Sequence, residues 1–321
     1  MGPGNANYPS TDYHSIMDAS TLSTLREAFR ERLQENAMLS CYTSARIGGP
    51  ADALLFVRSA DELAETAARL WKMDVPLIIL GVGSNVLVSD KGVRGVVIIN
   101  RARLVRFDTQ SEPPTVHAES GATLNDIAQQ AARLGLSGLE WAATVPGSLG
   151  GAVYGNAGAF DGDMAGNLIS VDILHRKRGR QTWPVEKMGY YYRTSVLKRE
   201  RPPVVLLAAE LALARGDPKA IQTKMEQFSA RRRSTQPPGA SMGSMFKNPP
   251  GDFAGRLIEA AGLKGKRIGN AEISTIHANF FINHGQTRAA DVKALIDLAQ
   301  KEVADRFGVK LELEIELIGQ W

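Results

Sequence analysis

The chain has 321 residues, of which 44% are hydrophobic and 22% charged, and its formal net charge is +4. This composition is typical of a globular protein and excludes a fibrous or low-complexity chain, and no apolar run approaches the length that spans a bilayer. Cys41 is the only cysteine, which excludes an intrachain disulfide and favours a reducing, cytoplasmic setting. The five histidines show no paired spacing, so we predict no metal site.

The length favours two domains, possibly three. Basic residues are scattered apart from short clusters at 176–180 and 231–233, which are more typical of solvated faces than of nucleic-acid patches. The first residues lack the charged and apolar regions of a secretory signal, and residues 1–18 are expected to form a loosely attached or disordered arm. We therefore expect no nucleic-acid partner, no membrane association and no obligate protein partner.

Periodicity and turn residues predict helices and strands along the whole chain. Ser20 or Thr21 is expected to cap a helix that ends near Asn36, and Asp61 to cap a helix that ends at Leu70. Further elements are predicted as a strand within 42–57, strands at 77–80, 86–88, 93–99, 115–119, 169–175 and 204–214, helices at 124–134, 219–233, 253–262 and 289–307, and strand ends near 268–273 and 280–283. Composition turns polar near 216–218, where we predict a domain boundary.

The last predicted strand, 311–318, alternates charged and apolar residues. That alternation is expected to place Glu312, Glu314 and Glu316 on one face.

Two glycine-containing stretches are candidate ligand loops. Gly81 to Asn85 (GVGSN) follows a predicted strand, and its backbone N–H groups could form a concave nest for phosphate. It is neither a Walker loop nor a strand–helix dinucleotide fingerprint, because no Gly-Lys-Ser/Thr follows and the next element is a strand.

The second stretch, Glu140 to Phe160, is rich in glycine and alanine and almost free of charge. Gly and Pro interrupt it too often for a stable helix, so we interpret it as a backbone-lined wall for a large planar or anionic ligand. The alternative is a buried crossover between two layers.

Three single residues stand out. Arg46 precedes the turn Gly48-Gly49-Pro50, which places a cation beside a ligand loop or beside an ordinary turn. Arg193 follows three tyrosines, for which the simplest explanation is cation–π packing. His277 lies between apolar segments and is expected to be a structural group.

Six motifs occur in one order: TSARIGGPAD, GVGSNVLVSD, VPGSLGGAVYGNAGAF, YYRTS, GSMFKNP and LELEIELIG. Together they resemble the UDP-N-acetylenolpyruvoylglucosamine reductase (MurB) family, in its shorter form. The resemblance implies an α+β fold, with an FAD-binding domain of the vanillyl-alcohol-oxidase (PCMH) type made of two α+β subdomains and a C-terminal α+β substrate domain. The implied boundaries are 1–40 for an arm and helix, 41–215 for the FAD domain and 216–321 for the substrate domain.

The resemblance also implies site residues. Arg193 matches the Arg of the YRxS motif, Ser244 the Ser of GSxFKNP, and Glu314 the second Glu of the family's LEPEV strand, and these three are the implied catalytic groups. The strand departs from the family pattern, with Leu313 in place of Pro and Glu316 where Arg is common. Tyr192, Arg193, Lys247 and Asn248 are implied substrate contacts.

The implied FAD contacts lie in the glycine-containing loops and beside them. They are Arg46, Gly81, Val82, Gly83, Ser84, Asn85, Val86, Ser120, Gly121, Ala142, Thr144, Pro146, Gly147, Ser148, Gly150, Gly151, Ala152, Asn156, Ala157 and Gly158.

The implied reaction has two halves. NADPH first reduces FAD, and reduced FAD then passes hydride to C3 of the enolpyruvyl group of a UDP-sugar. Arg193 would stabilise the negative charge that develops, Glu314 would orient Arg193 or share a proton with the substrate carboxylate, and Ser244 would protonate C2.

Two alternatives stay open. The chain could be another flavoprotein oxidase or dehydrogenase of the same fold, although GSMFKNP and the last strand argue against this. It could also be a non-catalytic flavin- or nucleotide-binding module, although the retention of all three implied catalytic groups argues against that.

Overall fold

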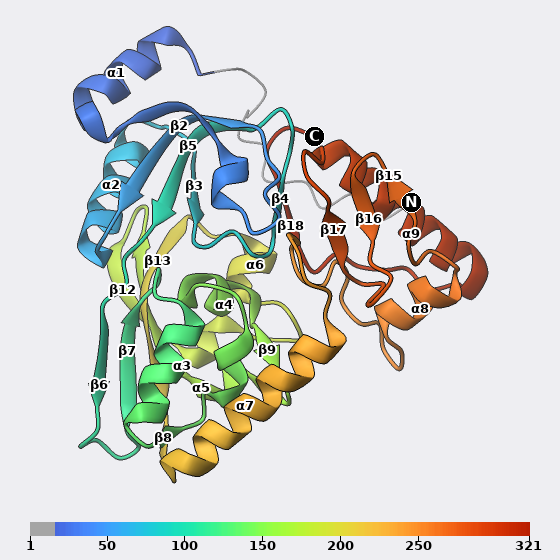
Figure 1. Cartoon of the computed structure of the whole chain (residues 1–321). Coiled ribbons are helices and arrows are strands. Elements are labelled where there is room, and N and C mark those ends of the chain that lie inside the picture. Colours follow the sequence, from blue (N-terminus) through green and yellow to red (C-terminus); the bar gives the residue numbers. More distant parts are fainter. Residues whose placement is uncertain (1–16) are drawn as a thin grey trace.

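The computed structural model describes residues 17–321 as an α+β fold, as expected. Two sheets with their helices form one half of the molecule, and a smaller sheet with helices packed around it forms the other (Figure 1). The predicted arm at 1–18 lies almost wholly outside the described residues. No helix in residues 17–321 is both long and apolar enough to cross a membrane.

The first sheet belongs to the first subdomain. Its strands are, in spatial order, β1 (Gln34–Met38), β2 (Pro50–Val57), β5 (Val93–Asn100) and β3 (Leu77–Leu80). β1 is antiparallel to β2, whereas β2, β5 and β3 run parallel. Helices α1 (Ala19–Phe29) and α2 (Ala60–Lys72) pack on this sheet through Leu25, Leu63 and Leu70, so both helices are amphipathic in the sense that the periodicity predicted.

The predicted bounds of these two helices were wrong. Asp18, rather than Ser20 or Thr21, caps α1, and the helix ends at Phe29 instead of Asn36 because residues 34–38 pair with β2 as β1. Ser59, rather than Asp61, caps α2, since its side chain accepts a hydrogen bond from the backbone N–H of Glu62 at 3.1 Å.

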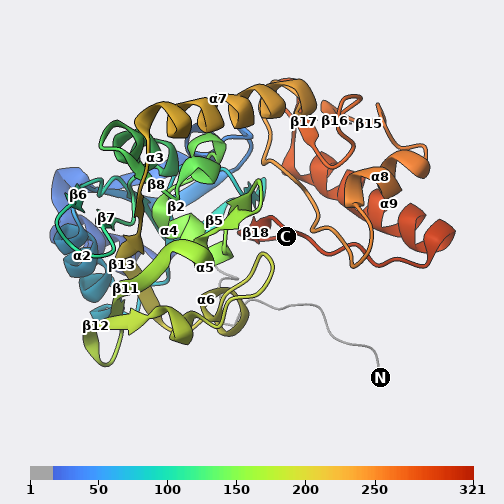
Figure 2. The same ribbon diagram turned by 90° about the horizontal axis from the view of Figure 1, so that it is seen from below.

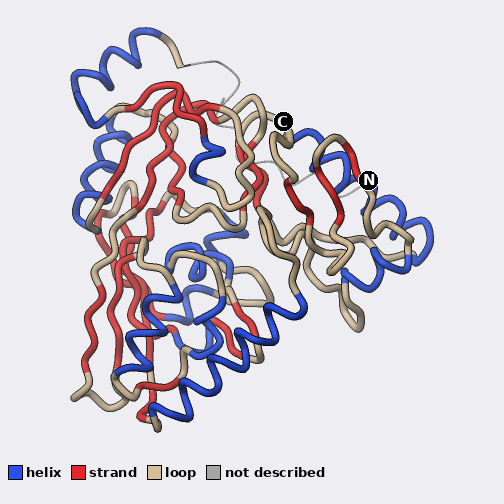
Figure 3. Tube along the Cα trace, viewed as in Figure 1, coloured by secondary structure: helices blue, strands red, loops and turns tan. Residues whose placement is uncertain are grey.

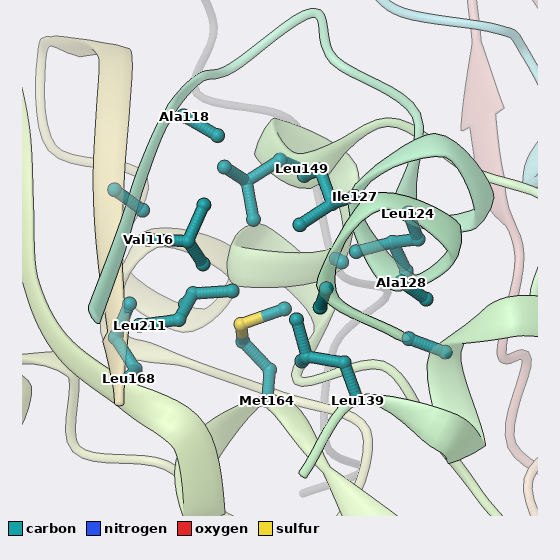
Figure 4. Close-up of a cluster of buried hydrophobic side chains, with 14 of the residues drawn as sticks. Val116, Ala118, Leu124, Ile127, Ala128, Leu139, Leu149, Met164, Leu168 and Leu211 are labelled. Atoms are coloured by element: carbon teal, nitrogen blue, oxygen red, sulfur yellow. The ribbon is translucent and has the colours of Figure 1, made fainter. Parts of the chain in front are cut away.

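The second sheet is antiparallel. Its strands are, in spatial order, β12 (Gly179–Pro184), β11 (Leu168–His175), β13 (Val204–Ala212), β7 (Thr115–Glu119) and β6 (Val105–Asp108). One face packs against α3 (Leu124–Arg133) and α4 (Leu149–Gly155), and Val116, Ile127, Leu149 and Leu211 meet in the core between them (Figure 4).

The helix α4 corrects our prediction that the glycine-rich stretch could not be helical. Ser148 caps it by accepting from the N–H of Gly151. A Cβ on Gly150 would lie only 3.0 Å from the carbonyl oxygen of Ser120. The glycines therefore serve close packing, since a short helix without side chains on one face can lie directly on a neighbouring loop.

The C-terminal half begins with the long helix α7 (Pro218–Thr235), which runs along the lower side of the first half towards the smaller sheet (Figures 1 and 2). That sheet contains β15 (Arg267–Ile268), β16 (Ala271–Ile273) and β17 (Phe281–Asn283). Helices α8 (Ala254–Ala260) and α9 (Ala289–Phe307) share its core with Phe246, Phe281 and Leu295.

The end of the chain returns to the first half. β18 (Glu316–Ile318) pairs in parallel with β4 (Val86–Val88), and the two strands lie between the large sheets and the C-terminal helices (Figure 3). The predicted strand at 311–318 was therefore too long, because the chain bends at 314–315. The three glutamates do not share a face but pair with different cations, Glu312 with Lys247, Glu314 with Arg193 and Glu316 with Lys198.

Several shorter elements complete the fold. They are 3-10 helices at Arg30–Arg32, Leu39–Tyr42, Glu140–Thr144 and Val185–Met188, helices α5 (Met164–Asn167) and α6 (Val196–Glu200), and the strand pairs β8 (Leu136–Ser137) with β14 (Ala214–Arg215) and β9 (Gly158–Ala159) with β10 (Gly162–Asp163).

Candidate active site

Arg193 lies in a tight turn anchored to the end of α4. Tyr191 and Thr194 exchange two backbone hydrogen bonds of 3.2 Å across the turn, and Arg193 has φ +55°. The amide of Asn156 donates to the carbonyl of Tyr191 at 3.1 Å, which ties the turn to the residue that ends α4. Because a non-glycine residue at positive φ is strained unless its surroundings hold it, this turn is a preorganised feature.

The guanidinium of Arg193 faces Glu314. Its Nε lies 3.0 Å from Oε1 of Glu314, yet the N–H is not aligned for a hydrogen bond, and this buried nitrogen has no hydrogen-bond partner in residues 17–321. The ring of Tyr192 lies 5.3 Å from the guanidinium carbon, within the range of a cation–π contact. The Nε donor of Arg193 is therefore close to a carboxylate without being hydrogen-bonded to it.

Ser244 lies in a loop that Asn279 holds in place. The buried side chain of Asn279 accepts from the N–H of Phe246 at 2.9 Å and donates to its carbonyl at 2.8 Å. On its other side, Met245 accepts from the N–H of Glu314 at 3.0 Å. The loop with Ser244 is thus adjacent to Glu314, and within the described part of the chain the Ser244 hydroxyl has no hydrogen-bond partner, so it is available to a ligand.

Positive charge collects around Glu314. Burial raises the pKa of its carboxyl, and the charges of Arg193 and two lysines only partly offset this. The lysines are Lys198, which the sequence did not single out, and Lys247. A raised carboxyl pKa beside three cations marks this residue as a candidate member of a functional site.

Arg232 of α7 is a further cation that sequence reasoning missed. Burial lowers the pKa of its guanidinium, and the nearby charge of Arg193 adds to this. Its Nε donates to Gln236 at 2.6 Å, and no carboxylate in residues 17–321 pairs with it. The cluster at 231–233 is therefore more than a solvated face, because its middle residue turns towards the site.

The remaining implied substrate residues are partly engaged. The Nζ of Lys247 lies 3.3 Å from Glu312, which is 70% exposed and therefore a weak competitor for a ligand. The side-chain oxygen of Asn248 accepts from the N–H of Ala254 at the start of α8. His277 accepts from the N–H of Asn279 and packs beside Gly255, which agrees with a structural role.

The two candidate FAD loops meet each other in space. The hydroxyl of Ser84 donates to the carbonyl of Pro146 at 2.7 Å, and a Cβ on Gly81 would collide with the side chain of Ser148. The backbone N–H of Gly150 donates to the carbonyl of Ser120 at 2.8 Å, which joins the loop after β7 to the second stretch. The sequence-separated stretches 81–85, 120–121 and 146–151 therefore form one surface.

This surface fits a large flat ligand with a phosphate-containing tail. At Gly147 and Gly151 a Cβ would meet only a serine hydroxyl, at 3.8 and 3.5 Å, so both glycines border open space. A hollow of about 220 Å³ runs beside Gly81 and Val82, and Arg101 and Arg103 line it. A larger hollow of about 470 Å³ lies against the outer face of the second sheet, and none of the predicted site residues lines it.

Not every implied FAD residue can offer its side chain. Ala142, Ala152 and Asn156 are buried, and the amide of Asn156 is already bonded to Tyr191. Asn85 donates its amide to the carbonyl of Glu314 at 3.2 Å. Arg46 is exposed, has φ +56°, and lies beside β17 through a contact of its carbonyl with Asn283. In residues 17–321 no group of three or more His, Cys, Asp or Glu side chains could hold a metal ion.

Two family models match the chain. Residues 51–183 match an FAD binding domain, and residues 235–318 match the C-terminal domain of UDP-N-acetylenolpyruvoylglucosamine reductase. The chain is similar to a reductase of that name from Chloroflexus aggregans, with 44% identity over 92% of this chain and 100% of the relative, and to one from Bacillus subtilis, with 40% identity over 93% and 98%.

A solved structure gives the same result. The crystal structure of UDP-N-acetylenolpyruvylglucosamine reductase from Thermus caldophilus superposes with a TM-score of 0.76 and 37% identity, and the match covers 89% of this chain and 99% of that one. These matches show that the chain belongs to the UDP-N-acetylenolpyruvoylglucosamine reductase family.

Proposed function

We propose that the protein reduces the enolpyruvyl group of UDP-N-acetylglucosamine enolpyruvate to give UDP-N-acetylmuramate, a precursor of peptidoglycan, with NADPH as reductant and FAD as bound cofactor. The observation that carries this proposal is the convergence of Arg193, the Ser244 loop and Glu314 beside the glycine-lined surface. The partners are then two small anionic molecules, and the cationic cluster of Arg193, Arg232, Lys198 and Lys247 suits them.

The cofactor would lie on the surface formed by residues 81–85, 120–121 and 146–151. When bound there, FAD supplies hydride acceptance from NADPH and hydride donation to the substrate. The protein groups supply position and charge: the glycine backbone borders the cofactor, and Gly147 and Gly151 leave room for it.

Arg193 is proposed to bind the substrate carboxylate. In residues 17–321 its Nε has no hydrogen-bond partner although it lies 3.0 Å from Glu314, and its planar fork suits a carboxylate. Addition of hydride at C3 leaves an electron pair at C2 that delocalises onto the carboxylate, and Arg193 would stabilise that charge more strongly than the neutral alkene.

Ser244 is proposed to deliver the proton to C2, which completes the addition of hydride and proton across the double bond. A serine hydroxyl is a weak acid, so the reaction needs nearby positive charge to stabilise the alkoxide. Lys247, three residues further along the same loop, and Arg193 supply it. Water would return the proton to Ser244 after turnover. Glu314 would orient Arg193.

The division of labour follows the implied boundaries. We propose that residues 41–215 bind FAD and also contribute Arg193 to the substrate site, that residues 216–321 supply its other substrate-binding groups, and that the segment up to residue 40 supports the first sheet through α1 and β1. Cytoplasmic action is proposed because the single cysteine, Cys41, is exposed and unpaired.

An absorbance experiment tests the function. The purified protein should be yellow, should bleach on anaerobic addition of NADPH, and should regain its colour on addition of the enolpyruvyl sugar nucleotide. Reoxidation by alcohols or hydroxy acids instead would indicate another flavoprotein of this fold. A colourless protein that takes up no FAD would contradict the proposal.

A further inference from the structure

One residue, Glu314, connects the three parts of the site through its main chain. Its N–H donates to Met245 in the Ser244 loop at 3.0 Å. Its carbonyl accepts from Lys198 at 3.1 Å and from Asn85 at 3.2 Å. The peptide groups on either side of Glu314 thus contact the Ser244 loop, helix α6 after the Arg193 turn, and the GVGSN loop.

Lys198 makes a second contact on the same segment. Its Nζ lies 2.9 Å from Oε1 of Glu316, and the two side chains are only 13% and 16% exposed. Arg201 reaches the other oxygen of Glu316 at 3.2 Å. Lys198 therefore contacts the C-terminal segment at two places on the bend at 314–315, the carbonyl of Glu314 and the side chain of Glu316.

A largely buried ion pair contributes little net stability, because the cost of removing both charges from water offsets their attraction. The role of such a pair is better explained as fixing the relative position of two chain segments. Lys198 lies on α6, five residues after Arg193. Ser195 holds α6 in place by donating to the carbonyl of Tyr154 at 2.6 Å. Lys198 thus joins the segment that carries Glu314 to the element that carries Arg193.

We infer that Lys198 is a positioning residue, which sets the place of Glu314 relative to Arg193 through the Glu314 carbonyl and Glu316. The inference deepens the proposed function and rests on it for its kinetic consequence. One part of the inference can be tested without any substrate: the contacts of Lys198 should keep residues 311–318 ordered.

The main variant is Lys198→Met, which keeps an unbranched stem of similar length but loses the charge and the donor. It should fold, because Arg201 still pairs with Glu316 and Asn85 still donates to the Glu314 carbonyl. Lys198→Arg is the conservative variant. Lys293→Met is the matched control, since Lys293 on α9 forms its ion pair in residues 17–321 with Asp297, one turn away on the same helix.

Stopped-flow measurement of the two half-reactions gives the first result. In Lys198→Met, reduction of FAD by NADPH should be little changed, while reoxidation by saturating enolpyruvyl substrate should slow by about 10- to 100-fold, the loss expected when a catalytic group moves by about 1 Å. Lys198→Arg should recover part of the rate, and Lys293→Met should match the wild type.

Hydrogen–deuterium exchange gives the second result, independent of activity. Peptides that cover 311–318 should exchange faster in Lys198→Met, while peptides from α9 should not change. Faster exchange with normal reoxidation, slow reoxidation with unchanged exchange, or an equal loss of both half-reactions with loss of FAD would each overturn the inference. If the wild type itself is not reoxidised by the enolpyruvyl substrate, the proposed function fails, and exchange alone then decides whether Lys198 holds the segment.

Discussion

Oε1 of Glu314 lies 3.0 Å from Nε of Arg193, although one residue belongs to a turn of the second subdomain and the other to the last segment of the chain. The pair is close without a well-formed hydrogen bond. That arrangement allows the guanidinium to turn its donors towards a second carboxylate. The pKa of Glu314 depends on its burial and on the charges of Arg193, Lys198 and Lys247.

Replacement of Arg193 by Lys tests the guanidinium fork. The charge remains, but the planar pair of donors is lost. We expect a large fall in substrate-dependent reoxidation, with FAD binding and reduction by NADPH much less affected. Stopped-flow absorbance measures both steps, and an unchanged rate of reoxidation would remove Arg193 from the mechanism.

Ser244→Ala should separate the two half-reactions most sharply. Bleaching of FAD by NADPH needs no proton at substrate C2 and should stay nearly normal, whereas reoxidation by substrate should slow by at least the ~100-fold typical of a lost acid. Ser244→Cys keeps a more acidic proton and should recover part of the rate.

Ser241 provides the control for this loop, and Ser241→Ala should be nearly normal. Equal slowing of both halves in Ser244→Ala would mean that the residue positions the loop instead of supplying the proton. A selective defect in Ser241→Ala would mean that the wrong serine had been chosen.

Two glycines allow cofactor exclusion to be distinguished from misfolding. Gly147→Val should reduce FAD occupancy while leaving the melting temperature of the apoprotein nearly normal, because a Cβ there meets only the Ser84 hydroxyl at 3.8 Å. Gly150→Val should reduce both, because its Cβ would press on the Ser120 backbone at 3.0 Å. Flavin absorbance and thermal melting measure the two effects, and full FAD occupancy in Gly147→Val would refute the placement of the cofactor.

Glu314 should make stability depend on pH. Burial raises the pKa of its carboxyl, so the folded protein binds this proton more tightly than the unfolded chain does. The resulting stabilisation is fully present below the unfolded pKa and is lost as pH rises through the folded pKa. The melting temperature of the wild type minus that of Glu314→Gln should therefore decrease as pH rises above 4.5, the ordinary pKa of a glutamate. An increase of this value with pH over the same range would contradict the prediction.

Elements with strong periodicity could be predicted from the sequence. The strands at 115–119 and 77–80 and the helix at 289–307 have the predicted bounds, since each alternates or repeats its apolar residues against a core. β1 was missed because four of its five residues, QENAM, are exposed and three of them, Gln34, Glu35 and Asn36, are polar. α4 was missed because its glycines lower helix propensity, and only the Ser120 loop beside it shows why they are needed.

Site residues that belong to a sequence motif were predicted, whereas residues that join the site only through packing in the folded chain were missed. The sequence placed Arg193, Ser244 and Glu314 together through a family resemblance, and the structure brings the Ser244 loop and Arg193 to Glu314. Lys198 and Arg232 carry no local signal, since each is one basic residue among several on a helix. They matter only because the folded chain places Lys198 beside Glu316 and Arg232 near the charge of Arg193, which no local pattern encodes.

The parallel pairing of β18 with β4 has a consequence for synthesis of the protein. Asn85 and Glu314, at the start of this pairing, are 229 positions apart. At ribosomal rates of about 5–20 residues per second, β4 waits roughly 10 to 50 s for its partner strand. Throughout that time the growing chain carries an unsatisfied strand edge beside the GVGSN loop, which is the kind of surface that pairs with other chains. Glu314 lies two residues before β18, so this residue of the candidate site and the strand that covers the edge reach the growing chain together.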